Sequence, residues 1–66
     1  MVFNGRALRE LREKAGVTQS ELAEFMGYYA KGVPNRSMIS KLEDKEDALN
    51  PRQERLAKTF LETMAQ

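Results

Sequence analysis

The sequence of 66 residues contains neither histidine nor cysteine, and its formal net charge at neutral pH is +1. Without histidine the commonest general base and metal ligand is missing, and without cysteine there is neither a disulfide framework nor a thiolate metal site. These absences leave little chemistry for catalysis, so we expect a non-enzymatic domain without metal or cofactor.

Charged residues make up 32% of the sequence and hydrophobic residues 41%, a balance typical of a folded helical domain. The length is close to the lower limit for a single apolar core, so we expect one domain over residues 1–66 and no small-molecule pocket. No apolar run has the length of a membrane span, and the first residues lack the apolar core of a signal peptide. We therefore expect a cytoplasmic protein without a membrane partner.

The charges are unevenly distributed along the chain. Residues 1–41 contain seven basic and four acidic residues, a balance of +3, whereas the remainder contains four basic and six acidic residues, a balance of −2. This asymmetry is consistent with a basic surface, formed by residues 1–41, that faces an anion. It is equally consistent with an ordinary solvated surface of mixed charge.

Leucine, alanine, glutamate, lysine and arginine dominate the chain, and β-branched residues never alternate over the length of a strand. The sequence therefore predicts an all-α fold. The first helix is expected to begin at the capping residue Asn4, with Phe3 closing over Leu8. It is expected to end at Gly16, because glycine adopts the left-handed conformation at low cost.

The second helix is expected to begin at Thr18, whose hydroxyl can cap it while the carboxylate of Glu21 reaches back to complete a capping box. Gly27 is its expected end. Its apolar side is predicted to contain Leu22, Ala23, Phe25 and Met26.

The third helix is expected to follow Pro34, with Asn35 as its cap and with Ile39 and Leu42 on its buried face. After a linker over residues 44–49, Asn50, Pro51 and Gln53 form a strong start for a fourth helix. Apolar residues then recur at helical spacing, so this helix either packs across the others or offers apolar surface to a partner: Leu56, Phe60, Leu61 and Met64.

The polar side of the third helix is the first candidate site. With Ile39 and Leu42 turned inward, the outward positions are Arg36, Ser37, Ser40 and Lys41. Arginine and lysine can donate to guanine O6 and N7, serine can donate or accept, and the major groove of DNA is wide enough to admit a helix. An ordinary solvated helix face explains the same four residues equally well.

The start of the second helix is the second candidate site. Its free backbone N–H groups and partial positive charge favour a phosphate. Gln19 adds a side-chain donor beside Thr18, so we treat both as candidate contacts to a DNA backbone.

The runs LRELREKAGVTQSELAEFMG and RSMISKLE resemble the lambda-repressor-like, Cro-type helix-turn-helix family of bacterial and phage regulators, over about residues 6–62. The resemblance implies a compact domain of four to five helices in which the third helix reads DNA. The implied base contacts are Arg36, Ser37 and Lys41, and the implied backbone contacts are Gln19, Ser40 and Asn35. It also implies a structural ion pair between Arg12 and Glu43.

The chain departs from the family pattern between the second and third helices, where residues 28–34 lengthen the turn. We expect a surface insertion, with Val33 buried and the preceding residues protruding. Alternatively, the second helix continues to Ala30 and ends at Gly32. Lys31 can neutralise a phosphate, whereas at least one of the two neighbouring tyrosines is expected to cover the core.

The resemblance and the polar face together favour a Cro-like transcriptional repressor that binds a palindromic DNA operator as a homodimer. Such a protein would be associated with the nucleoid in the cytoplasm. The alternative is a helix-turn-helix module that binds another protein, such as an antitoxin or an anti-repressor, because a fold does not establish a function.

Overall fold

The computed structural model describes residues 2–64 of the chain. Its helices are α1 (Gly5–Ala15), α2 (Gln19–Met26), α3 (Arg36–Glu43) and α4 (Pro51–Met64), and its strands are β1 (Tyr29–Ala30) and β2 (Val33–Pro34). The fold is mostly helical as expected, but the antiparallel β1–β2 hairpin corrects the prediction of an all-α chain. Among the described residues, no helix combines the length and hydropathy that crossing a membrane requires.

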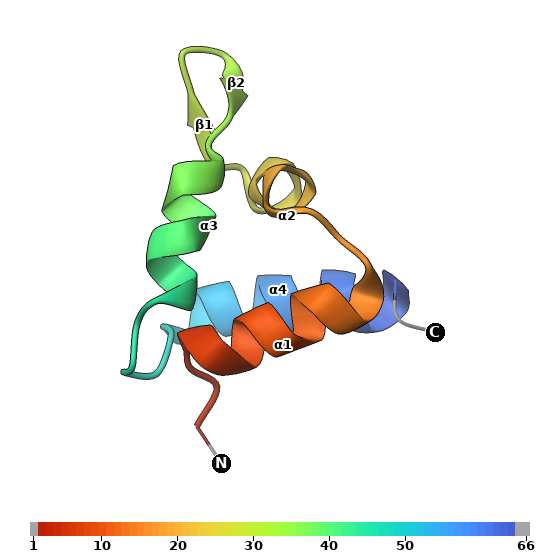
Figure 1. The fold of residues 1–66 in the computed structure, drawn as a ribbon, viewed down its shortest axis with the longest axis vertical. Helices are drawn as coiled ribbons and strands as arrows, with labels where there is room; N and C mark the ends of the chain where they lie inside the picture. Colours follow the sequence, from red (N-terminus) through yellow and green to blue (C-terminus); the bar gives the residue numbers. More distant parts are fainter. Residues whose placement is uncertain (1, 65–66) are drawn as a thin grey trace.

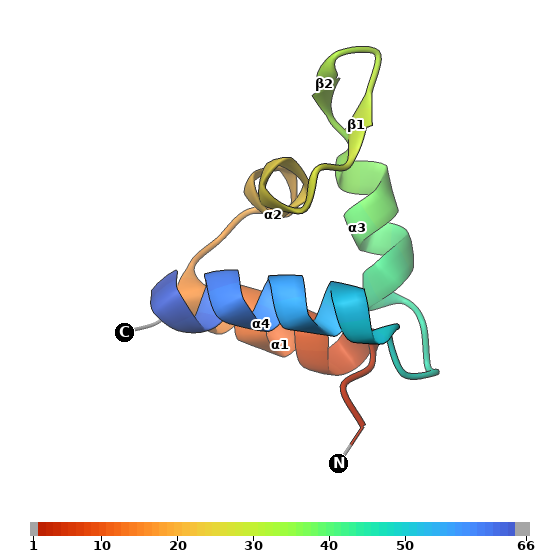
Figure 2. The ribbon, with the colours of Figure 1, turned by 180° about the vertical axis from the view of Figure 1, so that it is seen from behind.

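The helices form two levels, which Figure 1 shows from the front and Figure 2 from behind. Helices α1 and α4 pack against each other along one side of the molecule, and α2 packs against α3 above them. The hairpin projects beyond the N-terminal end of α3, away from α1 and α4. The part of the chain between α2 and α3 is therefore the most protruding part of the described structure.

Local capping chemistry sets the ends of α1 and α2, as the sequence predicts. The Oδ1 atom of Asn4 accepts a hydrogen bond from the Ala7 N–H at 3.0 Å, and α1 ends at Gly16 with a φ of 71°. Thr18 begins α2, and Gly27 ends it with a φ of 80°. The alternative in which the second helix continues to Ala30 is wrong, because the left-handed Gly27 turns the chain into the hairpin.

The start of α4 is also confirmed, whereas that of α3 differs in detail. The Gln53 N–H donates to Asn50 Oδ1 at 2.8 Å, and the Asn50 N–H donates to Gln53 Oε1 at 3.4 Å. The side chain of Asn35 makes no capping bond to α3. Instead the Asn35 N–H donates to the Tyr28 carbonyl at 2.8 Å, so the base of the hairpin, and not a cap, fixes the entry to α3.

The core takes one large, fully buried side chain from each helix: Leu8, Leu22, Ile39 and Leu61. Ile39 and Leu42 are buried as the spacing predicts. Phe25, which the sequence places on the apolar side of the second helix, is 43% exposed, and its ring stacks on that of Phe60 at a centroid distance of 4.2 Å. Both rings together cover the seam between α2 and α4.

The hairpin has a two-residue turn in which both central residues have positive φ, 52° at Lys31 and 80° at Gly32. This pattern is typical of the type I′ turn, whose twist matches that of paired strands. Val33 pairs with Ala30 and is 59% exposed, so the prediction that it is buried is wrong. Tyr28 packs against the core and its hydroxyl accepts a hydrogen bond from Gln53 Nε2 at 3.0 Å, which fulfils the expectation that one tyrosine covers the core.

Gly5 joins the start of α1 to the end of α3. It is buried, and its N–H donates to the Lys45 carbonyl at 3.0 Å. A Cβ atom at this position would lie 2.1 Å from the Leu42 carbonyl oxygen and 2.6 Å from two backbone atoms of Glu43. Only glycine allows the two helices to approach this closely.

We predict that Gly5→Ala lowers the free energy of unfolding by about 3 kcal/mol, because the new methyl group meets backbone that cannot rotate away. Helix propensity alone predicts the opposite sign, since alanine stabilises helices relative to glycine. The matched control is Gly16→Ala, where the added atom meets open space and only the left-handed φ is strained, at a cost of about 1 kcal/mol. Urea unfolding of both variants measures the difference, and equal losses would contradict the steric explanation.

Candidate nucleic-acid interface

The outer face of α3 carries the residues that the sequence proposes as base contacts. Arg36, Ser37, Ser40 and Lys41 are all exposed, while Ile39 and Leu42 on the opposite side are buried. This one-sided burial follows from the helical repeat, which places residues 39 and 42 on a common face. No salt bridge among the described residues uses Arg36 or Lys41, so both cationic groups remain available to a ligand.

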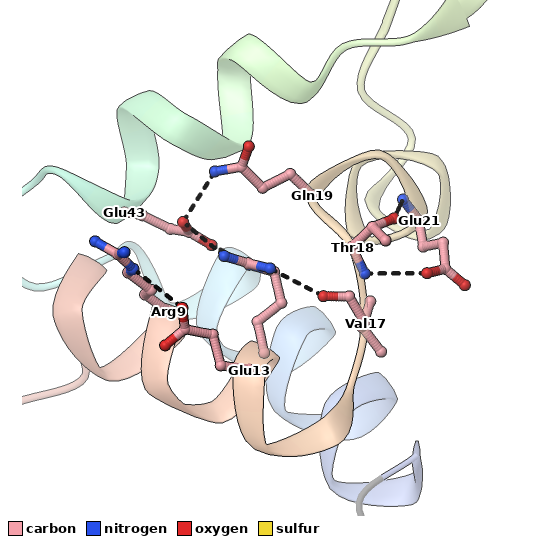
Figure 3. A network of polar contacts seen from close by, with 8 residues as sticks. Arg9, Glu13, Val17, Thr18, Gln19, Glu21 and Glu43 are labelled. Carbon is pink, nitrogen blue, oxygen red and sulfur yellow. Dashed lines mark hydrogen bonds and ion pairs between the residues drawn. The ribbon is translucent and has the colours of Figure 1, made fainter.

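A single carboxylate joins the elements below this face. Arg12 on α1 forms an ion pair with Glu43 at the end of α3, the pair that the family resemblance implies, and a second guanidinium nitrogen of Arg12 lies 3.3 Å from Glu43 Oε1. Gln19 Nε2 at the start of α2 donates to the same Oε1 at 3.1 Å. The third guanidinium nitrogen of Arg12 donates to the Val17 carbonyl at 2.9 Å (Figure 3). We call these residues, Arg12, Val17, Gln19 and Glu43, the Glu43 network.

The Glu43 network is mostly shielded from solvent. Only 13% of the Arg12 side chain and 5% of the Glu43 side chain are exposed. A buried charge that loses its partner is costly, so each contact in the network favours the observed arrangement of the three helices. Gln19 was expected to bind phosphate, and the structure commits one of its two amide N–H groups to Glu43 instead. The other N–H group remains for a ligand.

The start of α2 presents backbone donors beside the α3 face. Thr18 Oγ1 accepts from the Glu21 N–H at 3.0 Å, and the Thr18 N–H donates to Glu21 Oε1 at 3.0 Å. The N–H groups of Gln19 and Ser20, at the first two positions of α2, have no hydrogen-bond partner among the described residues. They are free to bind an anion at the positive end of the helix.

The two candidate sites meet at a shallow depression on the surface. Its lining comes from the end of α1, the start of α2 and the start of α3: Arg12, Thr18, Gln19, Ser20 and Arg36. Sequence analysis did not single out Ser20. The signal that could have found it is its position one residue after Gln19, within the first turn of a capped helix.

The remaining predicted contacts lie farther along the molecule. Ser40 is exposed on the outer face of α3, and Asn35 is half-buried at the foot of the hairpin. Lys31 lies in the two-residue turn of the hairpin, and the hairpin projects beyond the start of α3 (Figure 1). At the other end of α3 the exposed residues Asp44, Glu46 and Asp47 are acidic and only Lys45 among them is basic, so Arg36 and Lys41 precede a segment with a net negative charge.

The carboxylate of Glu21 is held ionised at the start of α2. Its hydrogen bonds with the backbone N–H and the side-chain hydroxyl of Thr18 lower its pKa below the ordinary value of 4.5. Because the pKa is lower in the folded chain, the stabilisation is present above pH 4.5 and is lost as the pH falls through the folded-state value.

We predict that a carbon-detected NMR titration of Glu21 gives a pKa below 4.5, and that Thr18→Ala moves it back toward 4.5 by removing the hydroxyl. A Glu21 pKa in the wild type that is not below 4.5 would show that the capping box is not formed in solution.

We predict that Glu43→Gln lowers the free energy of unfolding by about 3 kcal/mol, because Arg12 then keeps a largely buried charge without a counter-ion. Glu10→Gln is the matched control. It removes a carboxylate from the exposed pair of Arg6 and Glu10 and should cost less than about 0.5 kcal/mol. Thermal and urea unfolding compare the two variants. If Glu43→Gln lowers the free energy of unfolding as little as Glu10→Gln does, the Glu43 network has no structural role.

Comparison with known proteins adds no relatives. No family model matches the chain, and neither a curated protein nor a solved structure matches it.

Proposed function

We propose that this chain is a sequence-specific DNA-binding transcriptional regulator of the lambda-repressor-like helix-turn-helix type, with α3 in the major groove. The observation that carries the proposal is the exposed polar face of α3 lying beside the unpaired N–H groups that begin α2. A DNA duplex offers base edges in its major groove and phosphates beside that groove, so both features can contact one duplex.

The dimensions of α3 suit the groove. An α-helix with its side chains is about 10–12 Å in diameter, and the major groove, about 12 Å wide, can admit it. In the proposed complex Arg36 donates two hydrogen bonds to one guanine, and Ser37 and Lys41 contact neighbouring bases. These three side chains are exposed and lie on one side of the helix.

Phosphate contacts would hold the helix in register. In the proposed complex the N–H groups of Gln19 and Ser20, next to Thr18, contact one DNA strand, and Ser40 and Asn35 contact the backbone near α3. Such contacts supply affinity without sequence preference and make binding fall with salt.

We further propose that two copies bind a palindromic operator, with half-sites about 34 Å apart, and repress transcription by excluding polymerase. A single domain with so few phosphate contacts gains affinity most simply by pairing. The exposed Phe25, stacked on the half-buried Phe60, and the exposed Met64, one turn beyond Phe60 on α4, offer apolar surface for such pairing. The same surface supports the second candidate function, a module that binds another protein through α4.

The testing experiment selects bound duplexes from a random DNA pool and then measures affinity for the selected sequence. Arg36→Ala and Lys41→Ala should each weaken binding about 5- to 150-fold and relax base preference at their own positions, with unchanged melting temperature. Arg55→Ala is the matched control, since it removes the same charge from an exposed site on α4.

The outcome separates the two candidates. Selection of one sequence, with losses confined to the α3 variants, supports the regulator. Equal binding by all three variants, or no selected sequence, would contradict it and favour the protein-binding module.

A further inference from the structure

The hairpin between α2 and α3 does not contribute to the core. All five residues from Tyr29 to Val33 are exposed, and Tyr29 and Val33 keep 51% and 59% of their surface in contact with solvent. Burial therefore does not account for the hairpin.

The hairpin is nevertheless firmly anchored at its base. The Tyr28 N–H donates to the Ala23 carbonyl of α2 at 2.9 Å, and the Asn35 N–H donates to the Tyr28 carbonyl at 2.8 Å just before α3. The Tyr28 hydroxyl is bound to Gln53 of α4 at 3.0 Å. These contacts hold the projecting strands to three helices, so the tip has a defined place relative to α3.

The tip carries a positive charge at a strained position. Lys31 is the only charged residue between Glu24 and Arg36, and no salt bridge among the described residues uses its ammonium group. Its φ of 52° is a conformation that asparagine or glycine adopts more easily. The turn therefore has lysine at a position where the backbone conformation favours asparagine or glycine.

Building on the proposed function, we propose that the β1–β2 hairpin is a second DNA-contact element, which reaches the phosphates bordering the groove with Lys31 at its tip. The hairpin continues beyond the first residues of α3 (Figure 1). Three to four extended residues place its tip about 10 Å past Asn35, which is comparable with the groove width of about 12 Å. A phosphate strand at the groove edge therefore lies within its reach.

The shape of the hairpin argues against a protein partner. Its strands have two residues each, and Pro34 removes one backbone donor, so it is a poor template for an added strand. A turn of two residues also cannot supply the roughly 800 Å² per partner that a stable protein interface buries. A single cation on a rigid arm suits a phosphate better.

The test compares Lys31→Asn with the wild type on the selected operator embedded in longer DNA. Asparagine before Gly32 is the preferred sequence for this turn, so the variant keeps the hairpin and removes only the charge. We expect an unchanged or higher melting temperature, a loss of affinity of about fourfold at low salt and the same base preference. The slope of log affinity against log salt should fall in magnitude by about 0.9 for each bound copy.

Two matched measurements sharpen the comparison. Lys14→Gln removes an equal charge from an exposed position in the last turn of α1 and should leave the salt slope unchanged. A duplex trimmed just beyond the bases that α3 contacts lacks the phosphates that Lys31 is proposed to reach, so on this duplex the wild type should lose its advantage over Lys31→Asn.

The contrary outcomes are distinct. If Lys31→Asn binds like Lys14→Gln while Arg36→Ala fails to bind, the hairpin proposal is wrong and the regulator stands. If the wild type selects no duplex, the proposed function fails and the hairpin proposal with it. If Lys31→Asn changes self-association in sedimentation and not the salt slope, the hairpin contacts a second copy and the DNA proposal is overturned.

Discussion

The structure depends on one buried carboxylate. Glu43 ends α3, and its oxygens bind both Arg12 of α1 and Gln19 of α2. Because an isolated charge at this depth would be costly, the carboxylate is stable only when all three helices hold their places. The same bonds fix how α2 crosses α3. The exposed face of α3 and the free N–H groups of α2 are therefore presented together, on a scaffold whose apolar core lies behind them.

The hairpin connects two helices that stay in contact with each other. Its residues pair with each other, and the hydrogen bond from the Asn35 N–H to the Tyr28 carbonyl brings the two ends of the segment together. A closed hairpin of this kind joins the two helices without separating them. Loop closure of a few more residues costs little free energy, and the added length is directed outward along α3.

Sequence reasoning succeeded where the chemistry is local and failed where it is not. The capping box of Thr18 and Glu21 could be predicted because both partners lie within one turn. The hairpin could not, because its strands are too short to alternate and Lys31 is an unusual residue for its turn. At the candidate site, helical spacing located the outer face of α3. The bond from Gln19 to Glu43 joins residues 24 positions apart and could be found only from the packed structure.

The central claim is that a DNA duplex contacts the start of α2 and the outer face of α3. Amide NMR spectra recorded while the selected duplex is added test this claim most directly. The account predicts that the largest shifts occur at Gln19, Ser20 and residues 36–41, with little change along α4. Shifts concentrated on α4, with those of α2 and α3 unmoved, would contradict it.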